Sequence, residues 1–143
     1  MSGVGIVDDV RSSAEDAAAA LTGSGYRADF SPGSLWELER FFDEQAPGGQ
    51  PRPGGLLVES LGAKIFGVGA YLGEVIRRGC GGEWRGDDSD PDAEINVTLC
   101  LADQSLIWPI QRVMKRYRNG PEDNVAVYGH LLGLEVGPRP ASA

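Results

Sequence analysis

A glycine-dotted apolar segment from Gly54 to Arg78 constrains the fold of this 143-residue chain more than any other feature. Its length would suit a membrane span, but Glu59, Lys64 and Glu74 interrupt it, and a charge at the bilayer centre costs about 2.5–3.5 kcal/mol. Apolar residues recur at steps of three and four, which predicts the buried face of a helix in a soluble protein. These positions are Leu57, Leu61, Ile65, Val68, Leu72 and Ile76.

Four glycines lie inside this predicted helix, at Gly62, Gly67, Gly69 and Gly73. Each glycine destabilises a helix interior by about 1 kcal/mol relative to alanine, so another interaction should offset the summed cost of the four. Because Gly62, Gly69 and Gly73 fall on one side, we expect another backbone to approach that side closely. Packing within the same chain is the first interpretation, and a ligand or partner helix in the groove is the second. A break near Gly67, giving two shorter helices, is a further alternative.

The composition argues against several classes of protein. A formal net charge of −8 and a pI near 4.6 disfavour nucleic-acid binding, which usually needs a basic face. The N-terminal sequence has no basic segment followed by an apolar run, so no secretory signal is expected. Two cysteines, Cys80 and Cys100, make no disulfide framework and fit reduced thiols. We therefore expect a cytoplasmic protein with neither nucleic acid nor membrane as a partner.

The N-terminal part predicts two helices and a long loop. Periodic apolar residues predict a helix from Val7 to about Gly23, followed by a short strand or extended link over 26–30. Ser34 with Glu37 three residues later fits a capping box for a helix that runs to about Gln45. The proline- and glycine-rich segment 46–55 predicts a flexible loop within one domain.

The C-terminal part predicts a small antiparallel sheet and two more helices. Strands are expected from about residue 83 and over 95–101, the second half-buried with Cys100 on its polar side, and joined by a hairpin loop. A helix should begin at Pro109, and another should follow Asp123 with Leu131 turned inward. A frayed tail is expected from about 137. The prediction is a single α+β domain over 1–143, with about five helices and a small antiparallel sheet around the central glycine-containing helix.

The loop between the predicted strands contains the best candidate for a metal site. Asp88-x-Asp90-x-Asp92 imitates the opening of a calcium loop, because hard cations prefer several oxygen ligands at close spacing. Ala93 occupies the position that requires glycine, and Leu99 stands where the closing glutamate belongs. A solvated hairpin tip is therefore the first interpretation and weak cation binding the second, so no metal or other cofactor is expected.

Two groups of residues are the candidate binding sites. Glu74 and Arg77 of the central helix could form a buried hub against Glu83 and Trp84. Alternatively, Glu74, Arg77 and Trp84 could serve as polar anchors for a ligand. A local basic group contrasts with the acidic average of the chain and predicts either a solvated helix face or a patch for an acidic partner. The members of that group are Arg112, Lys115, Arg116 and Arg118.

Two segments of the chain also carry a family resemblance. The first contains Gly-Glu-x-x-Arg followed by Gly-Gly-x-Trp, and the second contains Pro-x-x-x-Val-x-Lys-Arg followed by Gly-x-Glu-Asp. Together they resemble a group of bacterial proteins of unknown function, over roughly residues 57–128. The resemblance implies a small cytosolic domain and no particular activity. The matching residues are Gly73, Glu74, Arg77, Gly81, Gly82, Trp84, Pro109, Val113, Lys115, Arg116, Gly120, Glu122 and Asp123.

Three hypotheses of function follow. The first is a non-enzymatic module that binds a protein partner through Arg112, Lys115, Arg116 and the loop 87–92; a toxin-neutralising, immunity-like role is one version. The second is a domain that binds a small molecule or anion near the glycine face of the central helix. The third is an enzyme that uses Glu74 or His130, the only histidine, as a general acid or base. No second catalytic group is fixed beside either residue by the sequence, so no catalytic residue is predicted.

Overall fold

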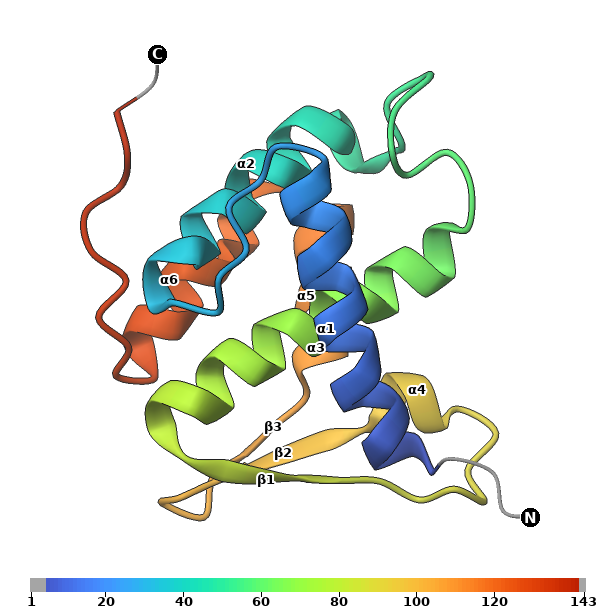
Figure 1. The fold of residues 1–143 in the computed structure, drawn as a ribbon, viewed down its shortest axis with the longest axis vertical. Coiled ribbons are helices and arrows are strands. Elements are labelled where there is room, and N and C mark those ends of the chain that lie inside the picture. The colour runs from blue at the N-terminus through green and yellow to red at the C-terminus, as the bar shows by residue number, and fades with distance from the viewer. Residues whose placement is uncertain (1–4, 142–143) are drawn as a thin grey trace.

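The computed structural model of the chain describes residues 5–141. Within that range six α-helices and one three-stranded antiparallel sheet form a single α+β domain (Figure 1). The helices are α1 (Ile6–Gly23), α2 (Leu35–Gln45), α3 (Leu61–Cys80), α4 (Ala93–Asn96), α5 (Pro109–Asn119) and α6 (Val125–Leu131). The strands are β1 (Gly82–Arg85), β2 (Thr98–Leu101) and β3 (Leu106–Ile107), and short 3₁₀ turns cover 32–34, 47–49 and 121–123. The predicted fold class is confirmed.

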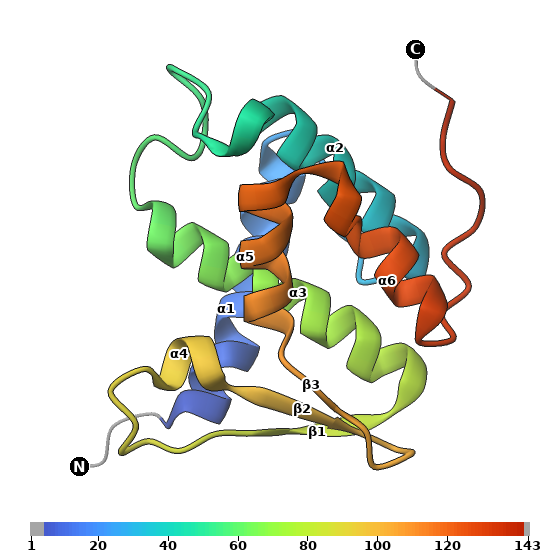
Figure 2. The ribbon, with the colours of Figure 1, turned by 180° about the vertical axis from the view of Figure 1, so that it is seen from behind.

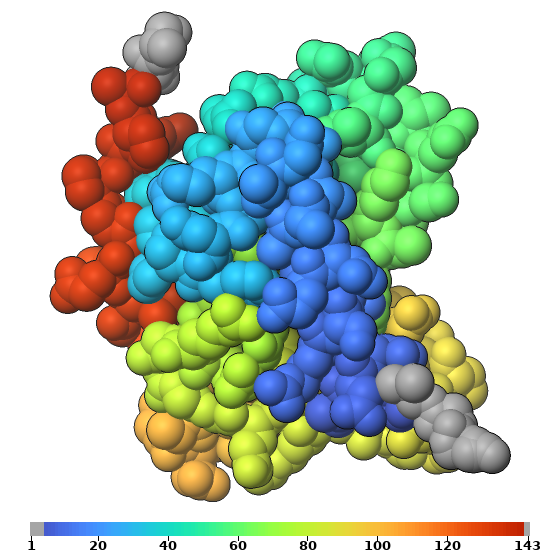
Figure 3. Space-filling view, viewed as in Figure 1, coloured from blue at the N-terminus to red at the C-terminus, as the bar shows by residue number. Residues whose placement is uncertain are grey.

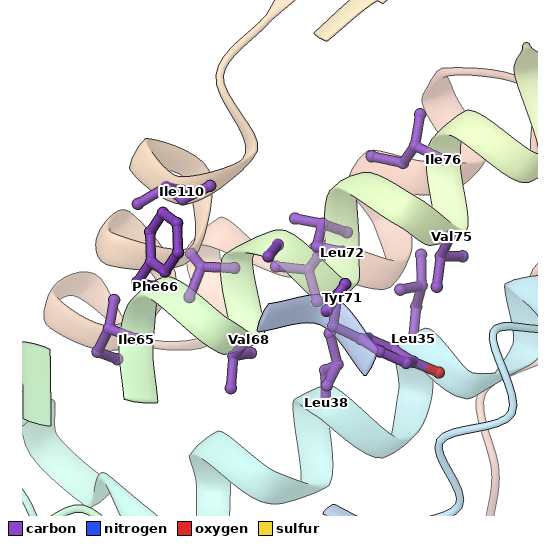
Figure 4. Close-up of a cluster of buried hydrophobic side chains, with 14 of the residues drawn as sticks. Leu35, Leu38, Ile65, Phe66, Val68, Tyr71, Leu72, Val75, Ile76 and Ile110 are labelled. Atoms are coloured by element: carbon purple, nitrogen blue, oxygen red, sulfur yellow. The ribbon is translucent and has the colours of Figure 1, made fainter. Parts of the chain in front are cut away.

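Helix α3 is the centre of the molecule. Helix α1 crosses it on one side in Figure 1, and α5 crosses it on the opposite side in Figure 2. Every residue from Ile65 to Ile76 is buried. Figure 4 shows the side chains of α3 lying between Leu35 and Leu38 of α2 on one side and Ile110 of α5 on the other. Among the described residues, no helix combines the length and the apolarity that crossing a membrane requires.

The boundaries of α3 differ from the prediction only at its start. The helix begins at Leu61, after Ser60 in a left-handed conformation with φ of 56°, so the predicted ridge residue Leu57 precedes it. Leu57 is nevertheless fully buried. The helix passes through Gly67 without a break and ends at Cys80; the next residue, Gly81, has a φ of 76°, which favours glycine.

The predicted capping box at the start of α2 is wrong. Ser34 already has helical angles, because the 3₁₀ turn over 32–34 leads directly into α2, whereas an N-cap residue needs an extended conformation. Its hydroxyl contacts the backbone oxygen of Ser31 at 2.7 Å and the hydroxyl of Tyr71 at 2.6 Å. The carboxylate of Glu37 instead accepts a hydrogen bond of 2.9 Å from the backbone N–H of Arg27. The link over 26–30 forms no strand.

The sheet places one face against the helices and the other outward. Trp84, Leu99 and Ile107 face one another across the three strands on the inner side. Cys100 lies on the outer side, as expected, but it is 5% exposed, so the prediction of a half-buried strand is wrong. The prediction that this strand begins at residue 95 is also wrong, because residues 93–96 form α4. Ile95 is exposed on that helix.

The C-terminal helices begin where the sequence predicts, but one side chain is misplaced. The side chain of Asn124 caps α6 by accepting a hydrogen bond of 2.9 Å from the backbone N–H of Val127. Leu131, expected inward, is 77% exposed, because this short helix buries Val125, Ala126 and Gly129 instead.

The loop 46–55 is attached to the end of α2. Its Arg52 donates a backbone hydrogen bond of 2.8 Å to the carbonyl of Gln45. The side-chain oxygen of Gln45 accepts a second bond of 2.8 Å from the backbone N–H of Leu56. These two bonds close the loop at its base.

Candidate functional site

The first predicted group, Glu74, Arg77 and Trp84, comes together as a buried cluster. The carboxylate of Glu74, which is 2% exposed, accepts a hydrogen bond of 2.6 Å from Nε of Arg77 and one of 2.8 Å from the indole N–H of Trp84. Burial alone would raise the pKa of Glu74, but the bonds from Arg77 and Trp84 outweigh it and hold that pKa below its usual value. Glu74 therefore ties the first strand to the central helix as a carboxylate.

The glycine face of α3 is filled by the chain itself. A Cβ atom added to Gly69 would lie 2.7 Å from the Cα of Ile110, so the backbones of α3 and α5 approach closely there. The ring of Trp84 occupies the space that a side chain at Gly73 would need. The interpretation of intramolecular packing is thus confirmed for these two glycines, and a ligand has no room beside them. A Cβ atom at Gly62 would meet nothing within 4 Å, so this glycine does not serve the same purpose.

The second predicted group is not a basic surface, and Arg116 is the main correction. This side chain is 2% exposed; its Nε donates to both carboxylate oxygens of Glu39 at 3.0 Å, and Nη2 donates to Asp43 at 2.8 Å. Glu39 also accepts a bond of 2.8 Å from the backbone N–H of Val125. Burial raises the pKa of Glu39 despite these partners. Arg116 follows the buried Val113 by three residues, so the helical period turns it inward.

The rest of the basic group is divided between a packed residue and exposed ones. Arg112 is half-buried, lies 3.4 Å from a carboxylate oxygen of Asp123, and covers the ring of Tyr128 at 4.3 Å. Lys115 and Arg118 are exposed. Two exposed cations on one helix do not make the patch that the sequence indicates.

An acidic surface, here called the acidic end, forms where the start of α1 meets the loop before α4. The backbone N–H of Ile6 donates a hydrogen bond of 2.6 Å to Asp88, and Gly86 packs so tightly on Ile6 that a Cβ atom there would clash. Figure 1 shows these two segments at the same end of the molecule. The exposed carboxylates that define the acidic end are Asp8, Asp9, Asp87, Asp88, Asp92 and Glu94.

Short polar contacts give the loop of the acidic end a defined shape. Asp87 accepts hydrogen bonds of 2.9 Å and 2.6 Å from the backbone and hydroxyl of Ser89, which lower the pKa of Asp87. Asp90 accepts a bond of 2.8 Å from the backbone N–H of Asp92 and one of 3.0 Å from the side chain of Asn96. The loop is therefore folded on itself through its own carboxylates.

The acidic end is distinguished by its charge. Within residues 5–141, its six carboxylates form no ion pair with a lysine or arginine. No set of three or more His, Cys, Asp or Glu side chains in that range is arranged to hold a metal ion. Sequence reasoning singled out the loop but missed Asp8 and Asp9, whose position in the first turn of a helix signals only favourable interaction with the helix dipole.

The remaining candidates for chemistry lie apart from one another. The thiol of Cys80 donates a weak bond of 3.5 Å to the carbonyl of Leu132, and burial raises the pKa of Cys80. His130 is exposed on α6, whereas the carboxylate of Glu74 is buried and accepts hydrogen bonds from Arg77 and Trp84. Comparison with known protein families, curated proteins and solved structures found no match to this chain.

Proposed function

We propose that this chain is a non-enzymatic protein-binding module whose acidic end binds a basic partner protein. The observation that carries the proposal is the gathering of six exposed carboxylates at one end of the molecule, none of which forms an ion pair within the described residues. Several arginines are paired within the fold, as Arg116 is with Glu39 and Asp43 and Arg77 is with Glu74. The carboxylates of the acidic end lack such partners in the described residues and face solvent. Complementary charge on a partner speeds association and suppresses wrong partners.

The fixed shape of the acidic end supports the same proposal. The bond from Ile6 to Asp88 joins two segments that are far apart in the sequence, and the contacts of Asp87 and Asp90 shape the loop. A surface that is ordered before binding loses less conformational entropy on association. Asp9, Asp92 and Glu94 make no side-chain hydrogen bond within the described residues, so they are free to pair with a partner's lysines and arginines.

We also propose the cytoplasmic location that the sequence indicates, and a relationship to the bacterial proteins of unknown function that the chain resembles. Its most concrete version is an immunity-like protein that neutralises a basic toxin, since an acidic surface suits a cationic target. The net charge of −8 equally disfavours nucleic acid as the partner.

The test compares two variants of the same formal charge. Asp9→Lys, Asp92→Lys and Glu94→Lys together cancel the negative charge of the acidic end without touching the bonds that shape the loop. Glu59→Lys, Glu122→Lys and Glu135→Lys together make the same change in net charge at exposed positions away from that end. Each protein is immobilised and exposed to a lysate of the source organism, and retained proteins are identified by mass spectrometry.

The wild-type protein and the control variant are expected to retain a common basic protein that the acidic-end variant does not retain. The captured protein should also elute as the salt concentration rises, because salt screens exposed charges. Circular dichroism is the control that checks whether both variants are folded. Equal retention by the acidic-end variant and the wild type, or retention that depends only on net charge, would contradict the proposal.

A further inference from the structure

A groove of about 580 Å³ lies between α1 and the first half of α3, on a different part of the surface from the acidic end. The two helices touch where Gly67 packs on α1: a Cβ atom added there would lie 3.4 Å from the Cβ of Ala17. Figure 3 shows α1, in blue, and the green segment that leads into α3 lying side by side on this face. Its lining residues include Ala17, Ala20, Leu21, Phe41, Leu56, Ala63, Lys64 and Val68.

The groove has the size and the surface of a small-molecule site. Pockets that bind small ligands are usually about 300–1,000 Å³ and mostly apolar, with a few polar groups that fix orientation. Leu21, Phe41 and Val68 are buried side chains that reach its floor. The wall supplied by α1 runs from Ser13 to Ser24, which is roughly 16 Å of helix at 1.5 Å per residue. An elongated apolar ligand fits this shape better than a compact one.

One cation stands at the groove without an acidic partner. Lys64 is exposed, and its ammonium group donates a hydrogen bond of 2.5 Å to the backbone carbonyl of Leu56 at the same groove. Within residues 5–141 it forms no ion pair, whereas Arg77, Arg78, Arg112 and other cations of the chain do. An ammonium group has three donors, so Lys64 retains capacity for an anion.

We infer that this groove binds an unbranched aliphatic monocarboxylate, a fatty acid of medium length. The tail lies along the apolar floor and the α1 wall, and the carboxylate pairs with the ammonium group of Lys64. Asp16, on the opposite wall, is also exposed and unpaired in the described residues, so it disfavours a carboxylate on its side and leaves the Lys64 side as the place for the head group. This site is independent of the proposed protein partner.

The test uses decanoate below its micelle-forming concentration, with decanol and decyltrimethylammonium as probes that share the tail. Binding is measured by calorimetry, and the contacted residues are mapped by shifts of backbone amide signals in NMR. Decanoate is expected to bind saturably and to shift signals of residues 13–24 and 60–68. Decanol should bind about tenfold more weakly, since a hydrogen-bonded charge is lost. Equal binding of decanol, tighter binding of the cation, or shifts elsewhere would overturn the inference.

Two substitutions test the contact with the carboxylate and the contact with the aliphatic tail separately. Lys64→Met should weaken decanoate binding about tenfold and leave decanol binding unchanged, whereas Lys115→Met, at an exposed lysine on α5, should change neither. Ala20→Trp, at an exposed position of the α1 wall, should fill the groove and abolish binding of both probes while the protein stays folded. Unchanged decanoate affinity in Lys64→Met or in Ala20→Trp contradicts the site.

Discussion

Replacing Gly69 with alanine is expected to destabilise the protein, although alanine is the better helix former. A Cβ atom at this position would lie 2.7 Å from the Cα of Ile110 and 3.0 Å from its Cγ1. Overpacking a tight contact costs about 1–3 kcal/mol, and the gain in helix propensity recovers about 1 kcal/mol. Because the nearest atom belongs to the backbone of α5 and cannot rotate away, we take the upper part of the range. The expected net loss is about 1–2 kcal/mol.

Gly62→Ala is the matched control, since it makes the same change in the first turn of the same helix. A Cβ atom there would meet nothing within 4 Å, so only the helix propensity and the smaller entropy of the unfolded chain act. A gain of about 0.4–1 kcal/mol is expected. Urea unfolding followed by far-UV circular dichroism gives both free energies, with equal m-values showing that the unfolding transition is the same. If Gly69→Ala proves as stable as Gly62→Ala, the close approach of α3 and α5 is refuted.

Three further substitutions test the buried polar contacts by urea unfolding. Arg116→Met should cost about 3–5 kcal/mol because it leaves the carboxylate of Glu39 buried and unpaired, and a loss as small as that of Lys115→Met would contradict this. Glu74 has a lowered native pKa, so its stabilising effect is complete above about pH 4.3 and is lost as the pH falls through the native pKa. Glu74→Gln should remove the loss of stability that accompanies protonation of Glu74 below about pH 4.3, so the free energy of unfolding should fall less steeply with acid than in the wild type; an unchanged acid-side slope would argue against it. Trp84→Phe should cost about 1–3 kcal/mol by removing the indole donor from the buried Glu74, and a loss below about 0.5 kcal/mol would not fit.

The helical part of the fold could be predicted because its signals are local. Periodic apolar residues identify α1, α2 and α3, and Pro109 and Gly120 mark both ends of α5. The start of α3 was harder to predict, since Leu57 continues the apolar ridge and is buried, yet the chain turns at Ser60. Burial and helical structure coincide along most of this segment but not at its beginning.

The candidate sites were predicted less well because they depend on contacts between distant segments. A charged residue such as Arg116 usually indicates a solvated surface; the helical period turns it inward, but the carboxylates of Glu39 and Asp43 that pair with it there lie on another helix. The loop with Asp88 was visible as an acidic segment. Its meeting with the start of α1 was not, because the sequence gives no sign that Ile6 bonds to that carboxylate.

The glycines of α3 show both outcomes within one element. Their spacing predicts a close backbone approach, which occurs at Gly69, while Gly73 accommodates the ring of Trp84 and Gly62 is uncovered. The sequence specifies which positions lack a side chain but not which neighbour uses the space. Only the arrangement of α5 and the first strand around α3 decides that.

The salt dependence of affinity for the captured basic protein tests the role of the acidic end most directly. Affinity of the wild-type chain is expected to fall steeply as salt rises, because exposed carboxylates are screened beyond about 10 Å at 0.1 M salt. The variant carrying lysine at Asp9, Asp92 and Glu94 should bind weakly at low salt and lose that dependence. An affinity that is insensitive to salt, or that is the same for the wild type and this variant, would contradict binding through the acidic end.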